Sequence, residues 1–74
     1  MLSDEIKKTR QKSILTQTEF AKEIGVSFST VNRWESGKGK PNLTAMKAIK
    51  EYCSKNGFSY SDIENEWLNY SQED

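Results

Sequence analysis

Apolar residues recur at three- and four-residue spacing along most of the chain, and no strand-like alternation of apolar and polar residues competes with this pattern. The spacing predicts helices over about 3–13, 16–24, 27–36, 42–54 and 61–70. The predicted fold class is all-α, a five-helix bundle formed by residues 1–74 as a single domain. Because no repeat or linker interrupts the pattern, we expect one hydrophobic core.

Capping residues mark most of the predicted helix boundaries. Thr16-Gln17-Thr18-Glu19 has the spacing of a capping box, and glycines at 25 and 37 follow the second and third helices. A side-chain oxygen at the start of a helix can accept a hydrogen bond from a backbone N–H that has no partner in the helix. On this basis the expected N-caps are Ser3, Thr16, Ser27 and Asn42.

Each helix is expected to place its apolar residues on one face. At 100° per residue, the third helix turns one group of side chains inward, namely Val31, Trp34 and Glu35. It turns another group outward, namely Phe28, Ser29, Asn32 and Arg33. The predicted apolar stripe of the fourth helix is Leu43, Met46, Ile49 and Cys53, and that of the fifth is Ile63, Trp67 and Leu68.

Composition and charge narrow the classes of function. No stretch approaches the roughly 20 apolar residues that span a bilayer, and the N-terminus MLSDEIKK does not resemble a secretory signal. We therefore expect a cytoplasmic protein without a membrane partner. The net charge is zero, but residues 1–40 carry eight basic and five acidic groups, a balance of +3 that residues 41–74 offset with −3. This polarity is compatible with a nucleic-acid partner bound by the N-terminal half.

Metal, redox and enzymatic chemistry are not expected. The chain has no histidine and one cysteine, Cys53, which we interpret as a small buried hydrophobic residue. It also has no phosphate-binding glycine loop. We therefore predict a protein that is not an enzyme and binds no cofactor or metal.

Residues 16–36 form the most specific pattern in the sequence. Two short predicted helices are joined by the three-residue turn Gly25-Val26-Ser27, and this arrangement is typical of a helix-turn-helix. Ala21 is small enough for the two helices to cross closely, and Gly25 permits the sharp reversal of the chain. The apolar positions that complete the pattern are Phe20, Ile24, Val26, Val31 and Trp34.

Residues 6–53 resemble the phage repressor and Cro-like helix-turn-helix family, also called the xenobiotic-response-element family of transcriptional regulators. The resemblance is carried by Ile6, Arg10, the run LTQTEFAKEIGVS (15–27), the run VNRWESGK (31–38) and Pro41. It implies a bacterial or phage regulator that binds a pseudo-palindromic DNA operator as a homodimer, with residues 27–35 in the major groove. We expect such a regulator to be a repressor.

The resemblance also implies a role for individual residues. The positions that meet base edges are Ser27, Phe28, Ser29 and Arg33, and Asn32 shares their outer surface. The positions that contact phosphate are Gln17, Lys38 and Lys40. Arg10 and Glu35 match an ion pair that ties the first helix to the third, which is a structural role. Bidentate donation by an arginine to guanine is the commonest specific contact in the major groove.

Several alternatives stay open at this point. One alternative is that the basic side chains are ordinary solvated ones, which applies to Arg33, Lys38 and Lys40. Another is that Phe28 packs into the core from the first turn of its helix. Residues Trp67, Leu68 and Tyr70 either cover the bundle or make a dimer contact. A different class of function is a protein-interaction module such as an antitoxin, which would use the C-terminal helix to hold a protein partner.

Overall fold

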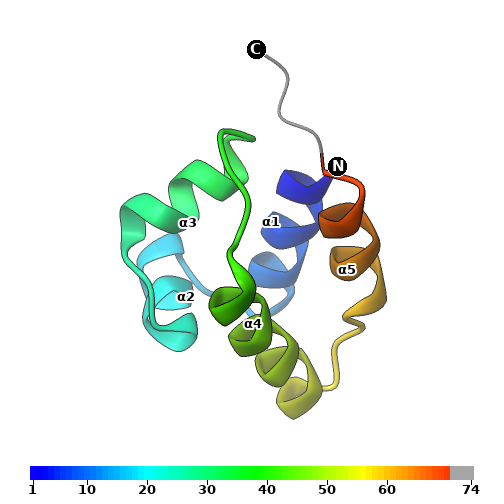
Figure 1. The fold of residues 1–74 in the computed structure, drawn as a ribbon. Helices are drawn as coiled ribbons and strands as arrows, with labels where there is room; N and C mark the ends of the chain where they lie inside the picture. Colours follow the sequence, from blue (N-terminus) through cyan, green and yellow to red (C-terminus); the bar gives the residue numbers. More distant parts are fainter. Residues whose placement is uncertain (71–74) are drawn as a thin grey trace.

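The computed structural model describes residues 1–70, and these form five α-helices. The helices are α1 (Leu2–Lys12), α2 (Gln17–Ile24), α3 (Phe28–Glu35), α4 (Leu43–Asn56) and α5 (Ser61–Leu68). In Figure 1, α1 lies between the α2–α3 pair on one side and α5 on the other, and α4 crosses below them. The predicted all-α bundle is confirmed for the described residues.

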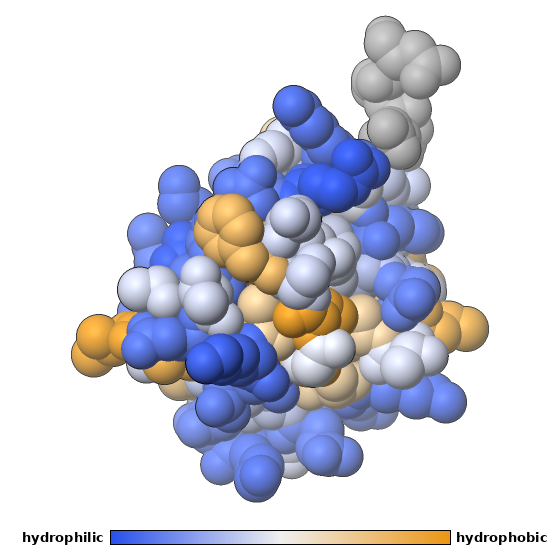
Figure 2. All heavy atoms as spheres, turned by 90° about the vertical axis from the view of Figure 1, so that its left-hand side faces the viewer, coloured by the Kyte–Doolittle hydropathy of each residue, from blue (hydrophilic) through white to orange (hydrophobic). Residues whose placement is uncertain are grey.

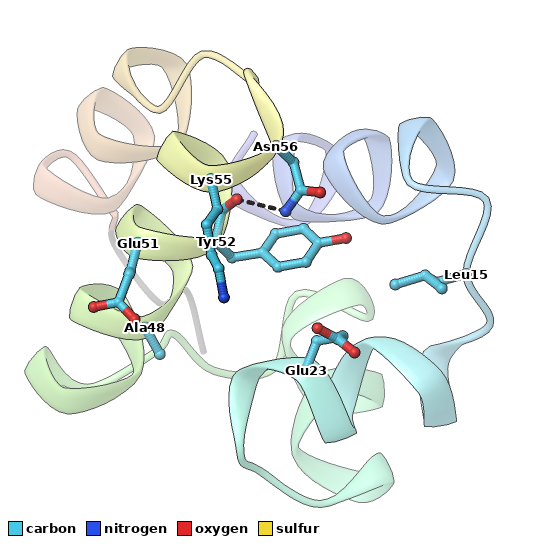
Figure 3. A pocket seen from close by; sticks show the side chains of 7 residues that line it. All are labelled: Leu15, Glu23, Ala48, Glu51, Tyr52, Lys55 and Asn56. Carbon is cyan, nitrogen blue, oxygen red and sulfur yellow. Dashed lines mark hydrogen bonds between the residues drawn. The ribbon is translucent and has the colours of Figure 1, made fainter.

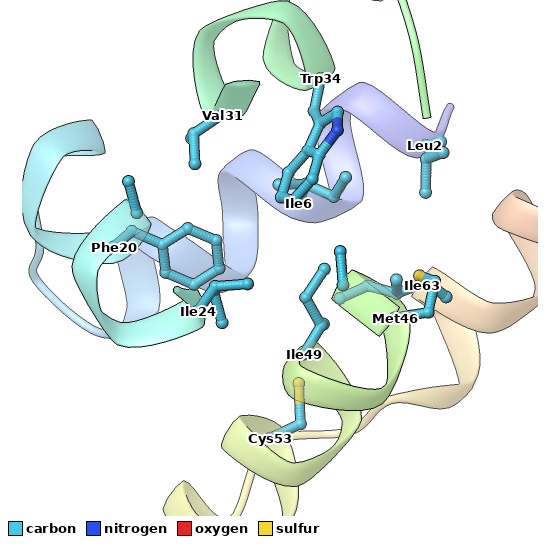
Figure 4. Close-up of a cluster of buried hydrophobic side chains, with 12 residues drawn as sticks. Leu2, Ile6, Phe20, Ile24, Val31, Trp34, Met46, Ile49, Cys53 and Ile63 are labelled. Atoms are coloured by element: carbon cyan, nitrogen blue, oxygen red, sulfur yellow. The ribbon is translucent and has the colours of Figure 1, made fainter. Parts of the chain in front are cut away.

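One apolar core joins all five helices. The completely buried side chains include Ile6 from α1, Phe20 from α2, Val31 from α3 and Ile49 from α4, with Ile63 of α5 only 1% exposed. Figure 4 shows these side chains converging from different helices on a common centre. Because truncating such a residue to alanine typically costs about 2–5 kcal/mol, each contributes a large fraction of the stability of so small a domain.

Three of the four predicted N-caps are observed. Thr16, Ser27 and Asn42 each precede a helix in extended backbone conformation, and each accepts a hydrogen bond from a backbone N–H three residues later. The fourth predicted N-cap, Ser3, is wrong, because α1 begins at Leu2 and its N-cap is Met1, two residues before Ser3. Leu2 is buried in the core, and its packing favours helical geometry from that position.

Two residues assigned to apolar stripes are exposed. Leu43, in the first turn of α4, and Leu68, in the last turn of α5, each retain 66% of their accessible surface. Both lie at helix ends, where a periodic stripe can extend past the neighbouring helices that would cover it. The rest of the α4 stripe (Met46, Ile49 and Cys53) is buried as predicted. Helix α5 also ends at Leu68, two residues before the predicted end at Tyr70.

Candidate nucleic-acid interface

The local sequence fixes the geometry of the α2–turn–α3 unit. The Thr16 N–H donates to Glu19 Oε1 (2.9 Å) and the Glu19 N–H donates to Thr16 Oγ1 (3.1 Å), which completes the predicted capping box. These hydrogen bonds lower the pKa of Glu19 below its ordinary value. Gly25 ends α2 with φ = 85°, a conformation that costs glycine little. Only Gly25–Ser27 separate α2 from α3, so the turn sets how the two helices cross.

Helix α3 has one buried face and one exposed face, as its periodicity predicted. Val31 is fully buried and Trp34 is 4% exposed, whereas Ser29, Asn32 and Arg33 lie on the surface. Phe28 is 50% exposed, so the alternative that it packs into the core is wrong. Figure 2 views the molecule from the side on which α2 and α3 lie, and this side is largely hydrophilic with separate apolar patches.

Ser27 has a structural task in the free protein. Its Oγ accepts from the Thr30 N–H (3.2 Å) and lies 2.9 Å from Thr30 Oγ1. The side chain that was predicted to read a base edge therefore also caps α3. A hydroxyl has one donor and two acceptor positions, so capping leaves it able to make a further hydrogen bond.

Arg10 connects α1 to α3. Its Nε donates to Glu35 Oε2 (2.7 Å), its Nη2 to Glu35 Oε1 (2.9 Å) and its Nη1 to the Leu15 carbonyl oxygen (2.9 Å). The hydrogen bond and charge of Glu35 raise the pKa of Arg10 above its ordinary value, against the effect of burial. The side chains are only 14% and 4% exposed, so this is a buried bidentate ion pair, the arrangement that the family resemblance implied.

The ion pair continues into a chain of hydrogen bonds that reaches the exposed face of α3. Gln17 Nε2 donates to Glu35 Oε1 (3.0 Å), and Asn32 Nδ2 donates to Gln17 Oε1 (3.2 Å). Residues 17 and 32 were predicted separately, and no local pattern signals their contact. Each amide nitrogen carries two N–H groups, so Gln17 and Asn32 both retain a donor beyond this chain.

Arg33 lies against the loop that follows α3. Its Nη2 donates to the Lys38 carbonyl oxygen (3.0 Å), and a Cβ atom on Gly39 would lie 3.6 Å from the same nitrogen. The guanidinium is exposed and has five N–H donors. One of these donors contacts the loop, so Arg33, predicted to read a base, lies beside Lys38, predicted to contact phosphate.

The two predicted phosphate-binding lysines have different surroundings. Both side chains are exposed, as a ligand contact requires. Lys40 Nζ lies over the Trp67 ring, 4.5 Å from its centroid, and 5.9 Å from that of Tyr70. Trp67 and Tyr70 are half-buried against the bundle, whereas Leu68 between them points into solvent. The prediction that the C-terminal segment covers the bundle therefore holds for the two aromatic residues.

A pocket of about 420 Å³ lies between α2 and α4 and shares no residue with the predicted interface. Figure 3 shows Tyr52 across it, with Glu23 and Lys55 among the charged side chains around it. The Tyr52 ring also packs edge-on against Phe20 of the core, with 5.7 Å between centroids. The complete lining is Leu15, Glu23, Ala48, Glu51, Tyr52, Lys55 and Asn56.

In residues 1–70, no three side chains of histidine, cysteine, aspartate or glutamate are grouped so that they could hold a metal ion. Within the same range, no helix combines the length and the apolar character needed to cross a membrane. Cys53 is buried, and burial raises the pKa of its thiol above the ordinary value.

Comparison with known proteins identifies the family. The model of a helix-turn-helix family matches residues 6–56, which include α2, α3 and the whole of α4. The chain belongs to this helix-turn-helix family. The match confirms the resemblance to the xenobiotic-response-element regulators that residues 6–53 indicated.

Two curated proteins are similar to this helix-turn-helix chain. One is the HTH-type transcriptional activator BcrR of Enterococcus faecalis, 35% identical over 52 residues, which cover 70% of this chain and 26% of BcrR. The other is the antitoxin PezA of Streptococcus pneumoniae, 35% identical over 66 residues, which cover 89% of this chain and 40% of PezA. The chain thus matches less than half the length of either relative. No solved structure matches it significantly.

Proposed function

We propose that this helix-turn-helix domain binds double-stranded DNA in a sequence-specific manner and regulates transcription, with α3 in the major groove. The observation that carries the proposal is the division of α3, whose inner face is buried while its outer face is open to solvent. A major groove about 12 Å wide admits an α-helix. The family match supports this use of the exposed face.

The outer face of α3 supplies side chains suited to base edges. Arg33 can donate two hydrogen bonds to guanine O6 and N7, a contact worth about 1–3 kcal/mol of discrimination. The half-exposed ring of Phe28 suits the methyl group of thymine. Ser27, Ser29 and Asn32 complete the proposed reading surface.

Phosphate contacts come from the elements beside α3. Gln17 occupies the first turn of α2, where the partial positive charge of the helix attracts an anion, and retains a free N–H. Lys38 and Lys40 extend the contact along the loop after α3. Because the protein has no net charge, its affinity for DNA depends on this local group rather than on the whole molecule.

The proposed complex is a homodimer on a pseudo-palindromic operator inside the cell, with repression as the result. Two α3 helices related by a twofold axis would read half-sites about one helical turn apart. Sedimentation with and without a palindromic duplex measures the stoichiometry. A reporter gene downstream of the selected site distinguishes repression from activation.

Selection of bound sequences from random duplexes at two salt concentrations tests the proposal. We expect enrichment of a defined site at both concentrations and loss of its recognition in the Arg33→Ala variant. Lys55→Ala is the matched control, because it removes one positive charge at the far end of α4, roughly 18 Å along that helix from the loop. Failure to enrich any sequence, with equal behaviour of both variants, would contradict DNA reading by α3.

A second candidate function is that of an antitoxin-like protein-interaction module. It is favoured by the similarity to PezA, which covers 89% of this chain and is more extensive than the match to BcrR. The exposed Leu68 on α5 offers an apolar contact for a protein partner. The two functions are compatible, and absence of an enriched DNA sequence would leave the interaction module as the better explanation.

A further inference from the structure

The loop after α3 accepts hydrogen bonds from side chains of α3 and of the C-terminal end of the described chain. It runs from Gly37 to Pro41, has no regular secondary structure and carries Lys38 and Lys40. Three of its carbonyl oxygens accept hydrogen bonds, from Tyr70 Oη at Gly37 (3.4 Å), from Arg33 Nη2 at Lys38 (3.0 Å) and from Trp67 Nε1 at Pro41 (2.6 Å). Two of these three donors belong to the C-terminal end of the described chain.

Trp67 contacts the loop in two ways at once. The edge of its indole donates to the Pro41 carbonyl oxygen, while the face of the same indole lies under the Lys40 ammonium group, 4.5 Å from the nitrogen. An aromatic face attracts a cation through its negative quadrupole. A lysine has many rotamers, so a side chain that is already held loses less entropy when it binds a ligand.

Lys40 can keep this contact while it binds an anion. The indole ring occupies one side of the ammonium group, and the side chain as a whole is exposed. An ammonium group carries three N–H donors that can be directed away from the ring toward a phosphate. Lys40 can therefore contact the Trp67 ring and a phosphate group at the same time.

We propose that Trp67 and Tyr70 are positioning residues for DNA binding: they hold the Gly37–Pro41 loop and the Lys40 side chain in the geometry that contacts phosphate. This inference rests on the proposed function and extends it to the region of α5, which packs beside α1 rather than beside α3. It assigns a role in DNA affinity to two residues that need not touch DNA.

A double-mutant cycle between Trp67 and Lys40 tests the proposal. DNA dissociation constants are measured for the wild type, Trp67→Leu, Lys40→Met and the double variant, on the duplex selected by the wild type. We expect Trp67→Leu to weaken binding about three- to tenfold, and Lys40→Met to have much less effect in the Trp67→Leu background than in the wild type. Each single change should also reduce the steepness of the salt dependence by up to about 0.9, the value for one phosphate contact.

Lys50 and Tyr60 provide a matched control pair. Lys50 Nζ lies 5.9 Å from the Tyr60 ring centroid, a similar contact outside the loop. Lys50→Met and Tyr60→Leu should leave the affinity and its salt dependence unchanged. All variants are compared at a temperature at which circular dichroism shows them folded, and Trp67→Met, which loses both the N–H donor and the aromatic face but keeps a large apolar side chain, serves where Trp67→Leu is unfolded.

The possible results separate the inference from the proposed function. The positioning role is overturned if Trp67→Leu and Lys40→Met act independently, or if the folded Trp67 variants bind DNA with unchanged affinity. Neither result contradicts the proposed DNA binding itself. Coupled effects with a reduced salt dependence support it, since a loss of fold stability alone would not change the salt dependence of the folded protein. If the wild type selects no duplex, the proposed function fails, and this inference fails with it.

Discussion

Ile14 has an unfavourable backbone conformation, and its side chain is almost fully exposed to solvent. It is the single non-glycine residue with positive φ among residues 1–70, at φ = 57°, and its side chain is 88% exposed. In this left-handed region the Cβ atom crowds the backbone, which costs roughly 1–2 kcal/mol, and β-branching adds to the crowding. The turn between α1 and α2 therefore contains local strain without compensating burial at this residue.

Replacing Ile14 with glycine should stabilise the protein. Relief of the strain outweighs the additional entropy of glycine in the unfolded chain, so we expect the free energy of unfolding to rise by about 0.5–1 kcal/mol. Urea titration measures the change. Ile14→Ala is the control, since it removes the same exposed side chain but keeps Cβ. An equal gain from alanine would show that backbone strain is not the cause.

At the scale of single elements, the capping box at the start of α2 links stability to pH. Because the folded-state pKa of Glu19 is lowered, its carboxylate contributes stability that is fully present above its unfolded pKa of about 4.3. This contribution is lost as the pH falls through the folded-state pKa.

The Glu19→Gln variant isolates this effect. We expect wild type and variant to differ in urea midpoint by a constant amount between pH 7 and about pH 5, and the difference to close as the pH falls below about 4. Glu51→Gln, in the middle of α4, is the matched control for loss of one charge. A Glu19 difference that stays constant down to pH 2 would contradict the assignment.

The ion pair between Arg10 and Glu35 is the main polar connection between α1 and α3. Glu35→Gln leaves a buried guanidinium without its counter-charge, so we expect a loss of about 3 kcal/mol, measured by thermal or urea unfolding. Replacing both residues, as Arg10→Met with Glu35→Leu, should recover most of this loss, because neither charge then remains unpaired. Additive destabilisation by the two changes would refute that explanation.

Features of the elements that depend on neighbouring residues were predictable from sequence. The caps at Thr16, Ser27 and Asn42 and the division of α3 into two faces follow from contacts within one or two turns. Ser3, Leu43 and Leu68 were misassigned because a helical period does not show where the tertiary neighbours of a helix begin and end.

Contacts between distant segments were not predictable by the same reasoning. The Trp67 hydrogen bond to Pro41 spans 26 positions, and the Asn32 bond to Gln17 spans 15. Neither pair forms a short-range pattern, and each requires the bundle to be assembled before the residues meet. The Arg10–Glu35 pair was anticipated from the family resemblance and not from spacing.

At the scale of the whole molecule, zero net charge separates this protein from strongly basic DNA-binding domains. Long-range attraction of DNA by the chain as a whole is therefore weak, and we expect the salt dependence of DNA binding to reflect the number of proposed phosphate contacts. Lys38→Ala should reduce the slope of log K against log salt concentration by about 0.9, whereas Lys55→Ala should leave it unchanged. Equal slopes for wild type and Lys38→Ala would exclude a phosphate contact by this residue.

The division of α3 into a buried and an exposed face also makes the domain a suitable scaffold for redesigned specificity. Val31 and Trp34 hold the helix on the bundle, while Phe28 and Ser29 face solvent. Surface substitutions away from packing and caps usually change stability by no more than about 0.5 kcal/mol. Under the proposed function, a library varied only at residues 28 and 29 should thus contain proteins of one fold with different preferences for DNA, so that selection acts on recognition and not on folding.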